Sequence, residues 1–118
     1  TMYSSTLFAG RLVVALMSAS AFVPFVSVHA ADLSAAKEKA EQVCSACHGK
    51  EGNAPVDPSY PRLAGQHQDY LRQALLDYRS DHRKNAIMGA QAKALTKKEV
   101  GDLAAYYASM PGQLVVKK

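Results

Sequence analysis

Apolar residues recur at helical spacing in three segments of the chain, and no segment alternates in the manner of a β-strand over a useful length. Residues 32–47 carry apolar side chains at positions 36, 40, 43, 44 and 47, and residues 67–78 carry them at positions 70, 71, 74, 75 and 78. Residues 96–109 repeat the pattern at positions 100, 103, 104 and 107. Such stripes are the buried faces of amphipathic helices. The pattern therefore predicts an all-α protein with three main helices.

Local signals at the helix ends support this division. Thr96 and Glu99 form a capping box that opens the last helix, and Asp32 can cap the first one. Residues 49–66 contain three prolines and three glycines and predict a long loop, and residues 79–95 predict a second one. Loops of this length without structure of their own are usually functional.

The chain begins with a run of 17 mostly apolar residues, at positions 12–28, which leads into the small-residue pattern VHA. This arrangement is typical of a secretory signal that is cut after Ala30. A membrane-spanning helix needs about 20 apolar residues, so an uncleaved anchor is the alternative. We expect residues 1–30 to be a signal peptide, residues 31–118 to form one domain, and the processed chain to have no stable membrane span.

Residues 31–118 have 13 Lys and Arg against 10 Asp and Glu, a net charge of +3, and the charged residues are interspersed along the sequence rather than clustered. They lack the basic face with interleaved aromatic residues that nucleic-acid-binding proteins use. Much of their apolar content is alanine, and no Phe or Trp follows Phe25. Small domains with so little apolar volume commonly depend on a disulfide, a metal or a cofactor. We therefore expect no nucleic-acid partner, and a core that something other than side chains completes.

The only two cysteines, Cys44 and Cys47, are followed directly by His48. In an exported protein a disulfide is the first alternative, but redox C-x-x-C pairs belong to a βαβ context, whereas this pair ends a predicted helix. A structural zinc site needs four ligands, and after the predicted signal peptide the chain offers only His67 and His82 as further histidine nitrogen donors. The sequence thus disfavours a redox pair and a zinc site, and it leaves a plain disulfide as the alternative.

Covalent haem attachment accounts for the whole C-x-x-C-H pattern. Cys44 and Cys47 lie one helical turn apart, so each can form a thioether with one vinyl group of a haem. His48 stays on the same face and can bind the iron. Export agrees with this interpretation, since haem is attached to such motifs outside the cytoplasm. The prediction is one haem c, attached through Cys44 and Cys47, with His48 as an iron ligand.

The sixth position of the iron decides between electron transfer and ligand chemistry. Met88 and Met110 are the methionines that follow the predicted signal peptide. Met110 stands directly before a Pro-Gly pair and suits a hydrophobic plug, whereas Met88 stands in NAIMGA, where small neighbours would let the backbone lie close to a flat ring. We expect Met88 to bind the iron, with His67 or His82 as the alternatives in a bis-histidine site.

Over residues 31–111 the chain resembles the class I c-type cytochromes, and within them the short periplasmic cytochromes of the cytochrome c-four group, where it matches one half of a two-haem member. The motifs that carry this resemblance are CSACHGKEGN, YPRLAGQHQDYLRQALLDYRS, RKNAIMGAQAKAL and EVGDLAAYYAS. The resemblance implies the cytochrome c fold, in which the first and last helices cross and two long loops help to surround the haem. The single C-x-x-C-H pattern implies a monohaem member.

The resemblance also implies roles for individual residues. The Pro61 carbonyl would accept a hydrogen bond from the second ring nitrogen of His48, which fixes the imidazole. Leu63 would pack on the haem face, and Met88 would be the distal ligand. Further implied residues are Gly101, Leu103 and Tyr106 at the helix crossing, and Arg62 and Tyr60 as candidates for contacts with the haem propionates.

These inferences predict a periplasmic electron carrier of a bacterial respiratory chain, and not an enzyme. A methionine ligand and burial in an apolar pocket both raise the reduction potential. This suits the transfer of single electrons to redox partners such as a terminal oxidase or a dehydrogenase. Two alternatives stay open: a haem subunit of a dehydrogenase complex, and a small-ligand-binding haem sensor or peroxidase with an open sixth position.

Overall fold

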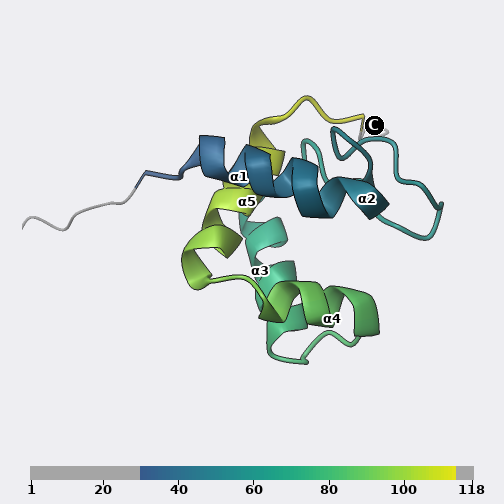
Figure 1. Ribbon diagram of the computed structural model, residues 1–118, viewed down its shortest axis with the longest axis vertical. Coiled ribbons are helices and arrows are strands. Elements are labelled where there is room, and N and C mark those ends of the chain that lie inside the picture. The colour runs from purple at the N-terminus through teal and green to yellow at the C-terminus, as the bar shows by residue number, and fades with distance from the viewer. Residues whose placement is uncertain (1–29, 114–118) are drawn as a thin grey trace, which may run out of the picture.

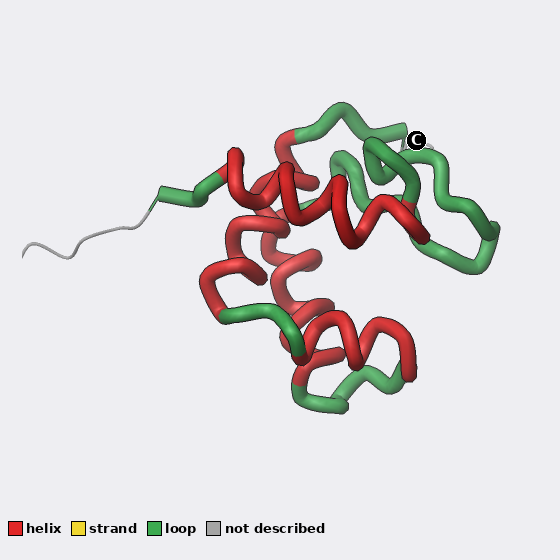
Figure 2. Tube along the Cα trace, viewed as in Figure 1, coloured by secondary structure: helices red, strands yellow, loops and turns green. Residues whose placement is uncertain are grey.

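The computed structural model describes residues 30–113, so nearly all of the predicted signal peptide lies outside the described residues. The helical segments in chain order are α1 Leu33–Lys39, the π-helical segment η1 Ala40–Cys44, α2 Ser45–His48, α3 Gln68–Arg79, α4 Ala86–Lys93 and α5 Lys97–Ser109. The described part of the chain contains no strand (Figure 2), which confirms the all-α class. No helix within it is long and apolar enough to cross a membrane.

The helices place two helix ends on the same side of the molecule. α1, η1 and α2 follow one another as a single rod that crosses α5 (Figure 1). α3 packs against both α5 and α4, and α4 lies at the opposite end of the molecule from this rod (Figure 1). The carboxyl end of α2 and the amino end of α4 therefore face the same side, and this side carries the candidate site described below.

The crossing of α1 and α5 is built largely from small side chains. Ala36 of α1 and Ala40, the first residue of η1, are both buried at 3% exposure. Leu103 of α5 is also 3% exposed. These residues share one hydrophobic core with Leu71 and Tyr107, and Tyr106 packs against it. Leu103 and Tyr106 thus lie where the sequence predicts. Because alanine contributes little volume, the helices approach closely and the core stays small.

Gly101 takes no close part in this crossing. A Cβ atom built on it meets no other heavy atom within 4 Å, so the approach of the two helices does not require a glycine there. The predicted role of Gly101 is wrong, because the alanines of the facing helix already allow the close approach. A glycine inside a helix costs about 1 kcal/mol relative to alanine, and here no contact offsets that cost.

Polar contacts secure the two ends of the crossing. The Asp102 carboxylate accepts a hydrogen bond from the backbone N–H of Asp32 at 3.1 Å and pairs with Lys98 at 2.5 Å. Lys39 pairs with Glu99 at 2.7 Å, and Glu99 also completes the predicted capping box of α5. The hydrogen bond from Lys39 and the capping contacts lower the pKa of Glu99 from 4.5 to about 2. Its stabilising contribution is therefore present at neutral pH and is lost as the pH falls from 4.5 toward 2.

The π-helical turn η1 changes which side chains face the core. The N–H of Ser45 bonds to the carbonyl of Ala40, five residues earlier, and this wider turn shifts the following residues around the helix axis. Val43, which the periodicity assigns to the buried stripe, is 44% exposed. That assignment is wrong because a period of 3.6 residues assumes unbroken α-helical turns.

Residues 86–93, predicted as part of the second long loop, form the helix α4. The side-chain oxygen of Asn85 caps it by accepting hydrogen bonds from two backbone N–H groups of its first turn, at 3.0 and 2.9 Å. Met88 therefore belongs to a helical turn and not to a loop. A Cβ atom at Gly89 would lie 3.8 Å from the carbonyl oxygen of Tyr78, so this glycine faces α3. The prediction of only three helices is corrected to four helical rods.

The loop of residues 49–67 is folded back against α2 and α5. Gly52 has a φ of 67°, a conformation that favours glycine, and its carbonyl accepts a hydrogen bond from the N–H of Leu63 at 2.7 Å. Asn53 donates a side-chain hydrogen bond to the carbonyl of Pro111 at 3.0 Å, which joins the loop to the segment after α5. These contacts bring Pro61 and Leu63 next to the end of α2.

Candidate functional site

His48 is the last residue of α2 and is only 6% exposed. Its Nδ1–H donates a hydrogen bond to the carbonyl oxygen of Pro61 at 2.9 Å, which is the contact that the resemblance implies. This bond selects the tautomer in which Nε2 carries the free electron pair. A buried imidazole with one nitrogen engaged in this way is prepared to bind a metal through the other nitrogen.

Cys44 and Cys47 flank the junction of η1 and α2, and both are half-buried free thiols. Burial raises the pKa of the Cys44 thiol, and the hydroxyl of Tyr107 partly offsets this effect. The carbonyl of Cys47 accepts a hydrogen bond from the N–H of Val56 at 3.0 Å, which ties the motif to the loop. The structure thus holds both thiols in the two turns that end at His48, where attachment of a flat group beside the imidazole is feasible.

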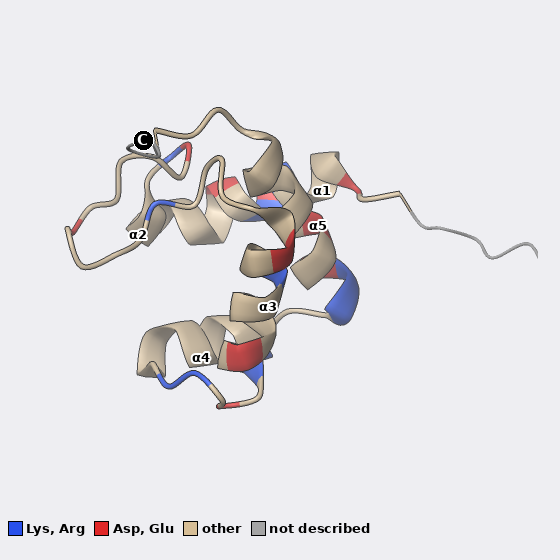
Figure 3. Ribbon diagram, turned by 180° about the vertical axis from the view of Figure 1, so that it is seen from behind, with Lys and Arg blue, Asp and Glu red and all other residues tan. Residues whose placement is uncertain are grey.

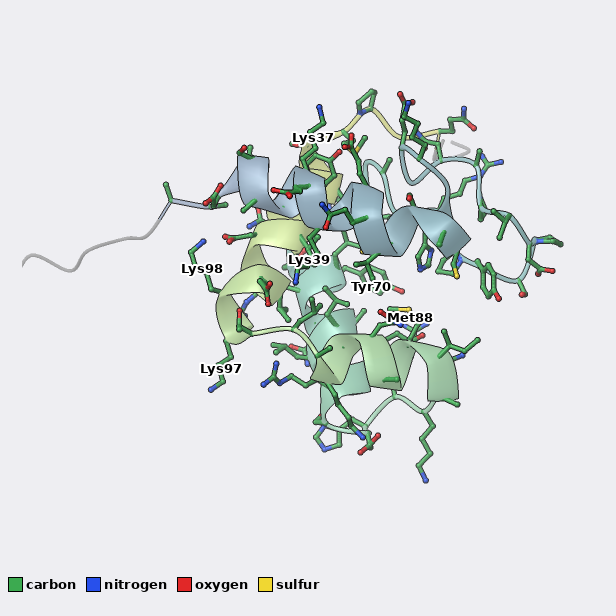
Figure 4. The ribbon with its side chains drawn as sticks, in the orientation of Figure 1. Lys37, Lys39, Tyr70, Met88, Lys97 and Lys98 are labelled. Carbon is green, nitrogen blue, oxygen red and sulfur yellow. The ribbon has the colours of Figure 1, made fainter. Side chains whose placement is uncertain are left out.

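Met88 is half-buried in the first turn of α4. Figure 4 shows its side chain on the side of α4 that is turned toward the rod formed by α1, η1 and α2. Tyr70 of α3 reaches into the same region (Figure 4), and its hydroxyl accepts a hydrogen bond from Arg83 at 3.5 Å. Met88 and His48 therefore belong to elements on opposite ends of this side of the molecule. Ligation by Met88 stays a prediction.

The other candidate ligands have different surroundings. Met110 packs against the hydrophobic core at the end of α5, in agreement with its predicted role as a plug. His67 and His82 are both exposed, and His82 lies 3.1 Å from the Ser80 hydroxyl. Within residues 30–113, no three His, Cys, Asp or Glu side chains gather closely enough to hold a bare metal ion. The two histidines have the exposure of solvated surface residues.

The remaining predicted residues lie along the loop that covers α2. Leu63 is half-buried and packs against the hydrophobic core. The ring of Tyr60 lies 6.3 Å from that of His48, and Arg62 donates a hydrogen bond to the Gln113 side chain at 2.9 Å. Contact of Leu63 with a haem face and contacts of Tyr60 and Arg62 with propionates stay predictions.

Sequence reasoning misses two residues that shape this site. Asn85 stands directly before an alanine-rich stretch, which is an N-cap signal and could have revealed α4. Tyr107 is predicted only as a core residue of α5, but Cys44 also packs against the core to which Tyr107 belongs. No local pattern encodes this packing, because the two residues are far apart in the sequence and come together only where the helices cross.

Three exposed apolar side chains adjoin predicted site residues, whereas charged residues are dispersed over the molecule (Figure 3). Val43 precedes Cys44 and is 44% exposed, and Ile87 precedes Met88 and is 54% exposed. Val56, whose N–H bonds to Cys47, is 69% exposed. We call Val43, Val56 and Ile87 the apolar rim. Each of its members adjoins a predicted site residue.

Comparison with known proteins reveals clear relatives. The sequence model of the family described as "Cytochrome c" matches residues 33–111. The chain is 49% identical over 80 residues to cytochrome c4 of Thiocapsa roseopersicina, a match that covers 68% of this chain and 41% of the relative. It is 39% identical over 83 residues to cytochrome c-554(548) of Halomonas halodenitrificans, covering 68% of this chain and 98% of that protein.

A solved structure has a similar fold. The crystal structure of reduced recombinant cytochrome c4 from Pseudomonas stutzeri superposes with a TM-score of 0.65 at 34% sequence identity, and the match covers 72% of this chain and 48% of the other. The match thus spans about half the length of the Pseudomonas stutzeri cytochrome c4 and less than half of the Thiocapsa roseopersicina protein. It spans nearly the whole length of cytochrome c-554(548).

Proposed function

Since this chain belongs to the cytochrome c family, we propose that it is a single-electron carrier and not an enzyme. As a member of the family with a C-x-x-C-H pattern, it carries one haem c, attached through Cys44 and Cys47. The observation that carries the proposal is the buried imidazole of His48, which donates to the Pro61 carbonyl and keeps Nε2 free for the iron. We assign residues 31–118 to this monohaem domain.

Haem c, when bound, supplies one-electron exchange at its iron. His48 of α2 and Met88 of α4 would be the residues that bind this iron. Methionine sulfur favours the ferrous state, and burial among Leu63 and the core side chains disfavours the extra charge of the ferric state. Both effects raise the reduction potential. A pair of ligands that stays bound in both states leaves no open position for a substrate, which suits a carrier.

The names of further relatives support redox proteins as partners. The chain is 40% identical over 67 residues to a thiosulfate dehydrogenase electron acceptor of Thiomonas intermedia. It is 31% identical over 67 residues to the cytochrome subunit of a sulfide dehydrogenase of Chlorobaculum tepidum. We propose that this chain works in the periplasm, where it accepts electrons from a dehydrogenase and passes them to a terminal oxidase or a similar acceptor. The second relative supports a second candidate, the haem subunit of a dehydrogenase complex.

The apolar rim is the proposed contact surface for these partners. Val43, Val56 and Ile87 adjoin the attachment cysteines and the methionine ligand, so a partner that covers them comes close to the haem edge. Their side chains carry no charge, and apolar contact is not weakened by salt. The matching surface on the partner is therefore apolar as well, and the association depends little on ionic strength.

A lysine placed in the rim tests this contact without an identified partner. In Val56→Lys, electron self-exchange between two copies of the holoprotein should slow several-fold and recover with added salt, because two like charges then meet at the contact. NMR line broadening in mixtures of oxidised and reduced protein measures this rate. Leu33→Lys is the matched control, since Leu33 is equally apolar and 44% exposed but lies at the start of α1. Equal slowing in both variants would rule out the rim as the contact surface.

The visible and near-infrared spectrum of the holoprotein tests the carrier function itself. We expect sharp low-spin bands after reduction and a weak far-red sulfur-to-iron band in the oxidised form, as His/Met ligation requires. The protein should come from a host that attaches haem, and both oxidation states should be recorded. A high-spin spectrum would instead support the ligand-binding sensor or peroxidase.

A further inference from the structure

The side chain of Arg83, in the turn between α3 and α4, is held along the surface of α3. The backbone N–H of Arg83 donates a hydrogen bond to the carbonyl of Asp77 at 3.1 Å. Its guanidinium carbon lies 4.8 Å from the centre of the Tyr78 ring, which is a cation–π distance. The guanidinium also donates a hydrogen bond to the Tyr70 hydroxyl at 3.5 Å. Three contacts with α3 thus determine where this positive charge lies, although the side chain is exposed.

These contacts bring the charge toward the candidate site. Tyr70 precedes Tyr78 by two helical turns, so the side chain of Arg83 runs back along α3 from its carboxyl end. The Tyr70 side chain reaches into the region between α4 and the rod of α1, η1 and α2, where Met88 also lies (Figure 4). The guanidinium that contacts the Tyr70 hydroxyl is therefore on the Met88 side of the site.

No carboxylate within residues 30–113 forms an ion pair with Arg83. The ion pairs of this part of the chain are Lys37–Glu41, Lys39–Glu99, Lys93–Asp81 and Lys98–Asp102. The carboxylate of Asp77 instead accepts a hydrogen bond from the Gln73 side chain at 2.7 Å. Arginine keeps its proton at every physiological pH, so the site has a permanent positive charge beside it.

We propose that Arg83 is a further residue that sets the reduction potential, because it holds this positive charge near the iron. The inference rests on the proposed function, since it requires an iron bound by His48 and Met88. Oxidation adds one positive charge at the iron, and a nearby cation opposes that step by Coulomb repulsion. Arg83 therefore stabilises the ferrous state and raises the potential. Because its side chain is exposed, water and salt screen much of the repulsion, and the expected effect is modest.

The test compares Arg83→Gln with Lys84→Gln in the holoprotein. Each variant removes one positive charge from an exposed position, and the two positions are adjacent. The contacts with Tyr70 and Tyr78 belong to Arg83 alone. In Arg83→Gln the equilibrium constant for reduction should fall about two- to five-fold, or about 20–40 mV at 59 mV per tenfold change. In Lys84→Gln it should change by less than about 1.5-fold, because a charge that no contact holds near the site is screened. Spectroelectrochemical titration at low ionic strength measures both.

Arg83→Lys separates the charge from a structural role. Lysine keeps the positive charge but loses the planar guanidinium that stacks on Tyr78. Its potential should therefore lie closer to that of the wild type than the potential of Arg83→Gln does, whereas loss of a structural contact would change both variants alike.

Three results would overturn the inference. They are an unchanged potential in Arg83→Gln, an equal change in Arg83→Gln and Lys84→Gln, and an equal change in Arg83→Gln and Arg83→Lys. A high-spin wild-type spectrum would instead count against the carrier function, so the two failures are distinguishable.

Discussion

Replacing Met88 with alanine should lower the reduction potential by roughly 0.1–0.2 V, within the ~0.8 V that axial ligands span, and should let the ferrous protein bind carbon monoxide. The physical reason is that thioether sulfur stabilises the ferrous state, and its loss leaves the sixth position open. Alanine is a good helix former and Asn85 still caps α4, so the fold should persist. Redox titration and the reduced spectrum under carbon monoxide measure the two effects.

Met110→Ala is the control for this experiment. Met110 is also half-buried, but it packs against the hydrophobic core at the end of α5. Its replacement should cost at most about 2 kcal/mol of stability and should leave the potential and the spectrum as they are. If Met88→Ala kept the wild-type spectrum while Met110→Ala lost the low-spin bands, the ligand assignment would have to be exchanged between the two methionines.

Replacing both attachment cysteines, in Cys44→Ser/Cys47→Ser, should abolish cooperative folding. Among the described residues, Val100 is the only large side chain that is less than 2% exposed, and much of the buried core is alanine. Apolar burial of this size offsets too little of the conformational entropy of the chain. Because the net stability of a domain is only about 5–15 kcal/mol, loss of the covalently attached group should remove all of it.

Circular dichroism and thermal unfolding of the purified chains check this expectation. The double variant should show much less helix than the wild type and no cooperative transition. Ser45→Ala is the matched control, since it changes the same motif and removes only the 2.6 Å hydrogen bond from the Ser45 hydroxyl to the carbonyl of Glu41. A double variant that melts cooperatively with wild-type helix content would show that the side chains alone stabilise the fold.

Local sequence signals predicted much of this fold. The capping box at Thr96 and Glu99 is present at the start of α5, and Leu103 and Ala104 lie on the buried stripe that the spacing indicated. The Pro61 contact of His48 could be expected only from the resemblance to cytochromes c, because nothing local relates a loop carbonyl to an imidazole. Periodicity and caps reveal helices, whereas contacts between distant segments require knowledge of the fold.

The failures have physical causes that periodicity does not register. Val43 is exposed because one π-helical turn shifts the helical phase. The sequence pattern did not predict helix α4, because its eight residues have little amphipathic pattern and include Gly89. The N-cap residue Asn85 is the one local signal of its start. Gly101 was given a role at the crossing that the alanines of the facing helix perform. The packing of Cys44 against the core that contains Tyr107 arises from the crossing itself and has no local signal.

The Asn85 cap has a consequence for the speed of electron exchange. Its side-chain oxygen holds the backbone of Met88 within the first turn of α4. With Met88 as the proposed ligand, oxidation and reduction then take place around a sulfur whose supporting backbone is already in position, so little nuclear motion accompanies each transfer. A competing small molecule would have to disrupt a capped helical turn before it reached the metal. Rapid electron self-exchange and resistance to competing small ligands would thus both depend on the side-chain amide of Asn85, which does not itself bind the iron.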